Sequence, residues 1–174
     1  MIESIQKIAI LYDASQAVLS TFDLDEVLNR ILAIIRDYFQ LQNGGVMLLN
    51  KERQELYVRA QFGRISMDLG YRVPVGKGIT GNAAALKRPV YAPDVSKDAR
   101  YVANVKPTKS EVAIPLMVRD EVVGVLDFQS DEIDYFKPEV IDLLTLFSTQ
   151  ASLALENARL AAPYTRWSVG ARYG

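Results

Sequence analysis

Hydrophobic positions recur every three or four residues at both ends of the chain, which is the period of an α-helix. In residues 4–19 one seam carries Ile5, Ile8, Tyr12, Ser15 and Leu19, and the opposite side carries Ile10, Leu11 and Val18. In residues 138–162 a heptad seam carries Val140, Leu144, Phe147, Ala151, Ala154, Ala158 and Ala161. The pattern predicts a long helix at each end, with apolar residues on more than one side.

A second helix is predicted to follow the first one. Asp23 is suited to cap its free backbone N–H groups, and Asp25 and Glu26 would lie favourably in its first turn. Its single apolar stripe consists of Leu24, Val27, Leu28, Ile31, Leu32, Ile35 and Phe39. A single stripe of this kind is typical of a helix that covers the sheet of its own domain.

Between these helices the period changes to short runs that are typical of β-strands. Residues 46–49 and 56–62 flank a polar turn and predict a hairpin, and residues 71–75 predict a further strand. Pro89 would end a short helix over residues 82–87, and residues 91–109 form a long polar loop that is either functional or mobile. Residues 111–118 and 121–130 predict a central antiparallel hairpin, with Pro115 at an edge or a bulge.

The composition indicates one folded domain. The 174 residues are 49% hydrophobic and 24% charged, which suffices for the core of a single domain. The formal net charge is −1 and the charges are scattered, so the sequence does not favour a nucleic-acid partner. No apolar run approaches the roughly 20 residues of a membrane span, and no signal-like segment follows Met1. We therefore expect a cytoplasmic domain without a membrane partner.

Cysteine and histidine are absent from the sequence. Their absence removes thiolate nucleophiles, imidazole bases and the usual attachment groups for bilin, haem and zinc. The remaining carboxylates, lysines, tyrosines and hydroxyl groups form no recognisable catalytic constellation. The sequence thus predicts no cofactor, no metal site and no enzymatic activity.

The segment Gly76-Lys77-Gly78-Ile79-Thr80-Gly81 matches the glycine spacing of a dinucleotide-binding fingerprint. No alternating parallel βαβ pattern surrounds it, and Pro89 ends the following helix after about two turns. A tight turn before a short helix is therefore the better interpretation of these glycines.

Several motifs together resemble the GAF family of sensory domains. They are the glycine motif with Ala83 to Ala85, Arg88-Pro89, Asp94-Val95, Asp98-x-Arg100-Tyr101, Ser110-Glu111-x-Ala-Ile-Pro115-Leu116, residues 123–128, Phe136 and residues 150–158. The resemblance implies an α+β, GAF-like fold related to profilin and PAS domains. In that fold a twisted antiparallel sheet has the terminal helices on one face and pocket loops on the other. The implied parts are a dimerisation and signalling helix (1–20), a GAF domain with a C-terminal signalling helix (21–162), and a flexible tail or linker remnant (163–174).

The family layout also implies a small-molecule pocket. It would be lined by Phe62, Ile79, Thr80, Asn82, Tyr91, Asp94, Arg100, Tyr101, Ser110 and Glu111. The helix terminus at Asn82, together with Arg100 and Lys109, would meet an anionic or polar group, while the tyrosines would supply stacking surface. The alternatives are that Arg100 and Lys109 are solvated, that the tyrosines pack against the sheet, and that the aspartates cap turns.

Members of the family bind different ligands, and this sequence lacks the marks of several branches. The bilin and haem branches need cysteine or histidine, and the branch that reduces free methionine sulfoxide works through cysteines, so the resemblance excludes these functions. Cyclic-nucleotide-binding members resemble one another in an Asn-Lys pair where this chain has Gln129-Ser130. Cyclic-nucleotide binding is therefore kept only as an alternative.

The leading hypothesis is a regulatory domain that binds an unidentified small molecule and relays this event through the terminal helices of a homodimer. The interface would contain Ile5, Ile8, Tyr12, Leu19, Phe147, Ala151, Ala154 and Ala158. An output domain, such as a kinase, a cyclase or a transcription activator, would receive the signal. The alternatives are a ligand-free dimerisation scaffold and, less favoured, an enzyme of unknown chemistry.

Overall fold

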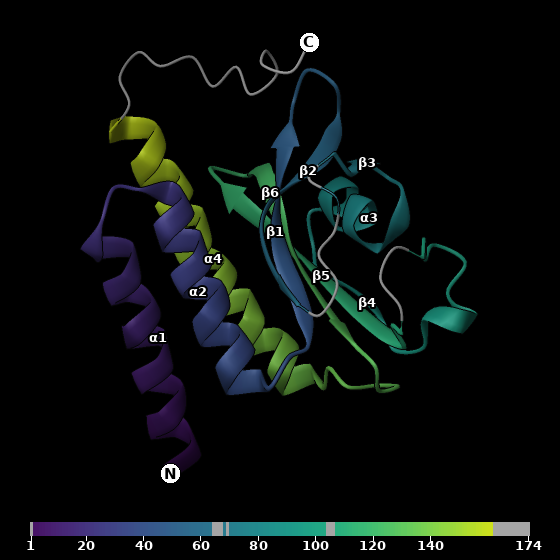
Figure 1. The fold of residues 1–174 in the computed structure, drawn as a ribbon, viewed down its shortest axis with the longest axis horizontal. Coiled ribbons are helices and arrows are strands. Elements are labelled where there is room, and N and C mark those ends of the chain that lie inside the picture. The colour runs from purple at the N-terminus through teal and green to yellow at the C-terminus, as the bar shows by residue number, and fades with distance from the viewer. Residues whose placement is uncertain (1, 64–67, 69, 104–106, 162–174) are drawn as a thin grey trace.

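The fold is built on one antiparallel sheet (Figure 1). The computed structural model describes residues 2–63, 68, 70–103 and 107–161. In these ranges six strands form a sheet in the order β3-β2-β1-β6-β5-β4. Helices α1, α2 and α4 lie on one side of the sheet, and the short helix α3 lies on the other side (Figure 1). This arrangement confirms the α+β architecture that the sequence predicts.

The helices on the first face are α1 (Ile2–Ser20), α2 (Leu24–Phe39) and α4 (Pro138–Ala161). The apolar stripe of α2 is buried against the sheet, as predicted, at Leu24, Val27, Leu28, Ile31, Leu32 and Ile35. Asp23 is the N-cap of α2, and its Oδ1 accepts a hydrogen bond from the backbone N–H of Glu26 at 3.1 Å. The main contacts of α1 are with α2 and α4, so α1 forms an outer layer on these two helices (Figure 1).

We expect Asp23→Ala to lower the free energy of unfolding by about 1 kcal/mol, because the substitution leaves a backbone N–H group of α2 without its cap. Urea unfolding followed by circular dichroism measures this change. Asp142→Ala, at an exposed position of α4, is the matched control and should change stability by less than about 0.5 kcal/mol. Equal losses in both variants would contradict the capping role.

The two predicted hairpins are confirmed. β1 (Asn43–Asn50) pairs with β2 (Glu55–Gly63), and β5 (Ser110–Val118) pairs with β6 (Glu121–Ser130). Arg119 and Asp120 connect β5 to β6 with φ angles of 50° and 65°, which are typical of a two-residue hairpin turn. Pro115 lies beyond residues 111–113, where β5 pairs with β4, so β5 is an edge at this proline as predicted.

Two other segments differ from the prediction. α3 (Gly78–Leu86) begins four residues earlier than expected, and the region predicted as a loop contains β4 (Val90–Ala92) and the short 3-10 helix η1 (Val95–Lys97). β3 (Arg72–Pro74) is as short as β4. Elements of three residues are too short to show a period in the sequence. β4 is recognisable only through its pairing with β5, which is a tertiary contact.

The sheet separates two hydrophobic clusters. Along β6, Leu126 and Phe128 pack in the cluster beneath the helices, while Val122 and Val125 pack in the cluster beneath α3. Both clusters are closely covered, and Phe128 and Val125 have no exposed surface. The face that carries α3 is therefore a second packed layer, and polar groups on it lie in apolar surroundings.

The residues predicted to form a dimer interface fall into two groups. Phe147, Ala151 and Ala154 are 0%, 0% and 4% exposed, because this seam of α4 packs on the sheet of its own chain. Ala158 is half-buried against the same cluster. The sequence-based assignment of this seam to an intermolecular surface is therefore corrected. Ile5, Ile8, Tyr12 and Leu19 of α1 are exposed instead.

Candidate functional site

The candidate site consists of polar side chains on the sheet face that carries α3. Side chains alternate between the two faces of a strand, and Leu126 and Phe128 of β6 point to the helices. Asp127 and Gln129 therefore point to the α3 side, where Glu111 of β5 lies opposite Gln129 in register. We call Glu111, Asp127 and Gln129 the acidic floor. Their exposed fractions are 5%, 2% and 2%, so these three polar residues are almost fully removed from solvent.

Hydrogen bonds order part of the acidic floor. Gln129 donates from Nε2 to Oδ2 of Asp127 at 3.0 Å, and its Oε1 accepts from the hydroxyl of Thr108 at 2.8 Å. Oδ1 of Asp127 is buried and accepts no hydrogen bond from an amide, hydroxyl or cationic group among the described residues, but the carboxyl groups of Asp127 and Glu111 are hydrogen-bonded to each other when one of them holds a proton. A buried carboxyl pair of this kind is rare in folded proteins unless it has a role. The pair is therefore the most unusual feature of the face.

Burial makes both carboxyl groups of the floor harder to ionise. It raises the pKa of Asp127 to about 6, and contacts with Glu111 and Gln129 partly offset this effect. The pKa of Glu111 is raised well above its usual range, first by burial and then by the neighbouring charge of Asp127. Because the two carboxyl groups are hydrogen-bonded to each other, they titrate as a pair, and the pKa of each lies above its usual value. A cationic group at the floor would favour ionisation of both.

Tyr101 lies beside the acidic floor. It packs against the apolar cluster beneath α3, and burial raises the pKa of its phenol, an effect that a hydrogen bond with Thr108 opposes. The charges of Glu111 and Asp127 raise the same pKa further. Tyr101 is thus close enough to the two carboxyl groups for their charges to affect its pKa, and it packs on the same face of the sheet.

The structure brings several of the predicted pocket residues to the same side of the sheet. Ile79 and Tyr101 belong to the cluster beneath α3, Thr80 is buried in α3, and Glu111 is in the acidic floor. Asn82 also lies in α3, where its side-chain amide donates to the carbonyl of Gly78 at 2.6 Å. These five residues come from α3, from β5 and from the segment that precedes β5.

Three predicted pocket residues lie on the opposite face. Phe62 and Tyr91 pack against the cluster beneath the helices, and the Tyr91 hydroxyl donates to Oδ1 of Asp134 at 2.9 Å. The Ser110 hydroxyl donates to the backbone carbonyl of Glu132 at 2.7 Å. Strand alternation directs Tyr91 and Ser110 to this face, so their assignment to the pocket is corrected.

Two further predicted residues make local ion pairs. Arg100 forms a two-point pair with Asp98, with Nε to Oδ1 at 2.9 Å and Nη2 to Oδ2 at 2.6 Å. Asp94 caps η1 through the backbone N–H of Ser96. The expected meeting of Arg100 with an anion is therefore not what the structure shows. The buried charged side chains on the α3 face of the sheet are acidic, which suits a cationic group rather than an anion.

The sequence prediction missed Asp127, Gln129 and Thr108 as site residues. Asp127 stands inside the apolar run of residues 122–128, where an unpaired charge would be costly in a buried central strand. A charged residue inside an apolar run was therefore the one sign in the sequence that Asp127 could be a site residue. The sign could be interpreted only once the structure placed Glu111, sixteen residues earlier, on the neighbouring strand and on the same face.

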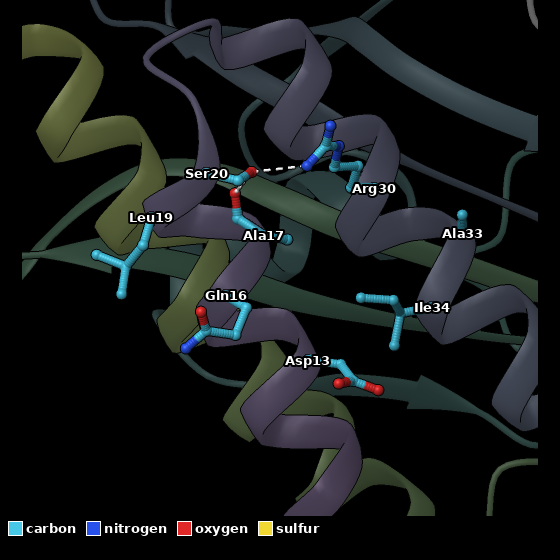
Figure 2. A pocket seen from close by; sticks show the side chains of 8 residues that line it. All are labelled: Asp13, Gln16, Ala17, Leu19, Ser20, Arg30, Ala33 and Ile34. Atoms are coloured by element: carbon cyan, nitrogen blue, oxygen red, sulfur yellow. Dashed lines mark hydrogen bonds between the residues drawn. The ribbon is translucent and has the colours of Figure 1, made fainter.

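A groove lies elsewhere, between α1 and α2 on the outside of the molecule (Figure 2). Its volume is about 480 Å³, and its lining includes Asp13, Gln16, Arg30 and Ile34. Arg30 donates a hydrogen bond to the Ser20 hydroxyl at 2.7 Å and forms an ion pair with Glu26. The groove is wide open and holds no buried, unpartnered polar atom among the described residues. We therefore place the functional site at the acidic floor.

Comparison with known proteins identifies the family. The family model of the GAF domain matches residues 22–156, and the chain belongs to this family. It is 24% identical to the nitrogen fixation protein AnfA of Azotobacter vinelandii over 163 residues, which are 87% of this chain and 30% of AnfA. It is also 34% identical to the free methionine-R-sulfoxide reductase of Escherichia coli over 68 residues, which are 39% of this chain and 41% of that protein.

The fold has close structural counterparts. A free methionine-R-sulfoxide reductase from Neisseria meningitidis, solved in complex with its substrate, superposes with a TM-score of 0.84 at 23% sequence identity. The alignment covers 91% of this chain and 93% of that one. The chain spans less than two thirds of the length of AnfA and of the Escherichia coli reductase.

These comparisons contradict one prediction made from the sequence. We predicted that the chain is not an enzyme, because it has no cysteine and no catalytic motif. Relatives by sequence and by structure include free methionine-R-sulfoxide reductases, which are enzymes. The prediction that the chain is not an enzyme is therefore contradicted. No helix in the described ranges has the length and hydrophobicity of a membrane span.

Proposed function

We propose that this GAF domain is a regulatory ligand-binding module whose acidic floor receives the ammonium group of a small, amino-acid-like molecule. The observation that carries the proposal is the buried carboxyl pair of Asp127 and Glu111, for which no cationic partner is found among the described residues. An ammonium group has three donors and one positive charge, so it would donate to these carboxyl groups and stabilise the charge of the floor.

The energetics of the floor support this proposal. Two carboxyl groups in apolar surroundings are costly, and replacement of such groups by apolar residues often stabilises a protein. Strongly perturbed pKa values with a named cause cluster at functional sites. Because Asp127 and Glu111 perturb each other in the centre of the sheet, a binding role explains them better than stability does.

The names of the relatives point to the same class of ligand. Free methionine sulfoxide, the substrate named for the reductases, is a single amino acid and therefore carries an ammonium group. The match covers only 30% of AnfA, a nitrogen fixation protein, which supports a role of this chain as one domain of a longer protein. Such a domain would act on an output domain and would relay binding through its terminal helices. Cyclic nucleotides are anionic, so the acidic floor does not favour them.

Isothermal titration with free L-methionine and with L-methionine-R-sulfoxide tests the proposal. The matched probe is 4-(methylthio)butanoate, which has the same side chain and carboxylate as methionine but no amino group. We expect at least one amino acid to bind and the matched probe not to bind. Glu111→Gln should weaken binding at least about 30-fold, which corresponds to the 2 kcal/mol or more that a buried charge partner contributes.

The controls separate three outcomes. Arg100→Gln lies outside the floor and should leave the dissociation constant within about threefold, since Arg100 is paired with Asp98. Binding of the amine-free probe with equal affinity would contradict the ammonium role. No heat with any probe would favour the ligand-free scaffold. Because relatives are enzymes, parallel mixtures with an added dithiol, which supplies the two electrons that the cysteine-free chain cannot, are analysed for reduction of the sulfoxide to methionine and water. Conversion faster than with the dithiol alone would make the floor part of an active site.

A further inference from the structure

The two carboxyl groups of the acidic floor lie in contact inside the sheet. Glu111 of β5 is opposite Gln129 of β6, so Asp127 is the diagonal neighbour of Glu111 on the same face. Strands lie on both sides of each carboxyl group, because Glu111 also pairs with Ala92 of β4 and Asp127 also pairs with Gly45 of β1. The contact between the two groups is therefore fixed by the register of three strand pairs.

This contact requires a proton. Ionised carboxylates have only acceptor oxygens, so a hydrogen bond between Asp127 and Glu111 forms only when one of the two groups is protonated. If both groups were ionised, the two like charges would repel each other at close range in apolar surroundings. The floor without a ligand therefore contains two carboxyl groups, one proton and one negative charge near neutral pH.

The groups that face the pair do not neutralise its charge. Asp98 and Tyr101 lie in the segment before β5, and the charge of Asp98, which is paired with Arg100, raises the pKa of Glu111 further. Helix α3 and strand β1 have no charged side chain, and Tyr91 of β4 points to the opposite face. No lysine or arginine in the described ranges lowers the pKa of either carboxyl group. The proton is thus the positive charge of the floor.

We propose that the ammonium group of the ligand replaces this proton, so that ligand binding releases a proton from the acidic floor. The inference rests on the proposed function and adds that pH regulates the affinity of the site. In the exchange the O–H bond of the protonated carboxyl group breaks and the proton passes to water or buffer. Both carboxyl groups remain as carboxylates, and the three N–H donors of the ammonium group take the place of the single O–H donor.

The proton and an ammonium group compete for the same oxygen atoms. Oδ2 of Asp127 already accepts a hydrogen bond from Gln129 at 3.0 Å, which leaves Oδ1 and the carboxyl group of Glu111 for a further donor. While the proton is present, the two carboxyl groups bond to each other instead of to a ligand. A positive charge within about 4–6 Å lowers the pKa of a carboxyl group by about 1–3, and here it would act on both groups. The bound cation therefore favours loss of the proton.

Isothermal titration with L-methionine and L-methionine-R-sulfoxide at about pH 7 counts the released protons, because phosphate and Tris buffers have different ionisation enthalpies. We expect about 0.5–1 proton to be released per ligand, and the dissociation constant to fall about three- to tenfold when the pH rises by one unit. Asp142→Asn, which removes an exposed carboxylate of α4, is the matched control and should release the same number.

The outcomes of this titration separate the two proposals. Glu111→Gln keeps the shape of the side chain but cannot share a proton with Asp127, so its weaker binding should release less than about 0.2 proton. Binding to the wild type with equally little release would overturn the exchange and leave the proposed function intact. Absence of binding by both amino acids would overturn the two proposals together.

Infrared spectroscopy of the ligand-free protein tests the proton itself. At about pH 7.5 exposed carboxyl groups are ionised, so the carbonyl absorption of a protonated carboxyl group reports a buried one. We expect this band in the wild type, and we expect it to disappear in Glu111→Gln, whose fold is checked by circular dichroism. A wild type without the band, or a band of equal strength in Glu111→Gln, would overturn the exchange whatever the ligand.

Discussion

Asp127→Asn is expected to raise the free energy of unfolding at pH 7.5 by about 3 kcal/mol, although it removes a native charge. Burial raises the pKa of Asp127 from 3.8 to about 6, and a pKa difference of 1 between the folded and unfolded states corresponds to about 1.4 kcal/mol. The amide of asparagine has the same shape, carries no charge and can still accept the hydrogen bond from Nε2 of Gln129. The substitution should abolish amino-acid binding, so stability and function would change in opposite directions.

The pH dependence of this effect has a definite sign. Because the folded-state pKa is above the unfolded one, ionisation of Asp127 penalises the folded state at every pH above about 6. The penalty decreases as the pH falls from 6 toward 3.8 and disappears below that value. The advantage of Asp127→Asn at pH 4.5 should therefore be less than half of its value at pH 7.5. Urea unfolding of both proteins at these two pH values measures the difference.

A matched substitution and a lower pH limit sharpen this experiment. Asp142→Asn removes an exposed carboxylate and should change stability by less than about 0.5 kcal/mol at either pH. Below pH 4 the carboxyl groups of Asp98 and Asp134 complicate the comparison, because their pKa values are lowered mainly by hydrogen bonds to Arg100 and Lys137. An Asp127→Asn protein less stable than the wild type at both pH values would show that the charge stabilises the fold.

Much of the fold could be predicted from the sequence because its long elements have strong periods. α2, with its single apolar stripe, and the continuous apolar strands β5 and β6 each extend over at least nine residues, and the structure confirms all three elements. The prediction of a loop over residues 91–109 was wrong because the elements in this region contain only three residues each. The position of β4 is decided by its pairing with β5, which is a tertiary contact. The apolar seam of α4 was found correctly, but the sequence could not tell whether the sheet or a second chain covers it.

The candidate site was harder to predict than the fold. Of the ten residues proposed for the pocket, Glu111 and Tyr101 lie at the acidic floor, whereas Tyr91 and Ser110 point to the other face. A one-residue step along a strand reverses the direction of a side chain, so approximate strand limits cannot assign faces. Asp127 was part of the recognised family motif, but its partner Glu111 became evident only when the register of β5 and β6 was known.

Phe147→Glu is expected to unfold the domain, whereas Leu153→Glu on the same helix should leave it folded. Phe147 has no exposed surface and lies against Phe39 with ring centroids 6.4 Å apart. Truncation of a buried phenylalanine alone costs about 3–5 kcal/mol, and an unpaired carboxylate adds a further penalty. The sum approaches the 5–15 kcal/mol total stability of a typical domain.

Circular dichroism and urea unfolding of the two variants distinguish the two sides of α4. Leu153 is 44% exposed, so Leu153→Glu should keep the wild-type spectrum and lose less than about 1 kcal/mol. The sequence pattern placed Phe147 in a dimer interface, where a charge would separate the subunits without unfolding them, and the buried position of Phe147 replaces that expectation. If Phe147→Glu were folded, Phe147 could not be a core residue of its own domain, and this seam of α4 would have to meet a second chain instead.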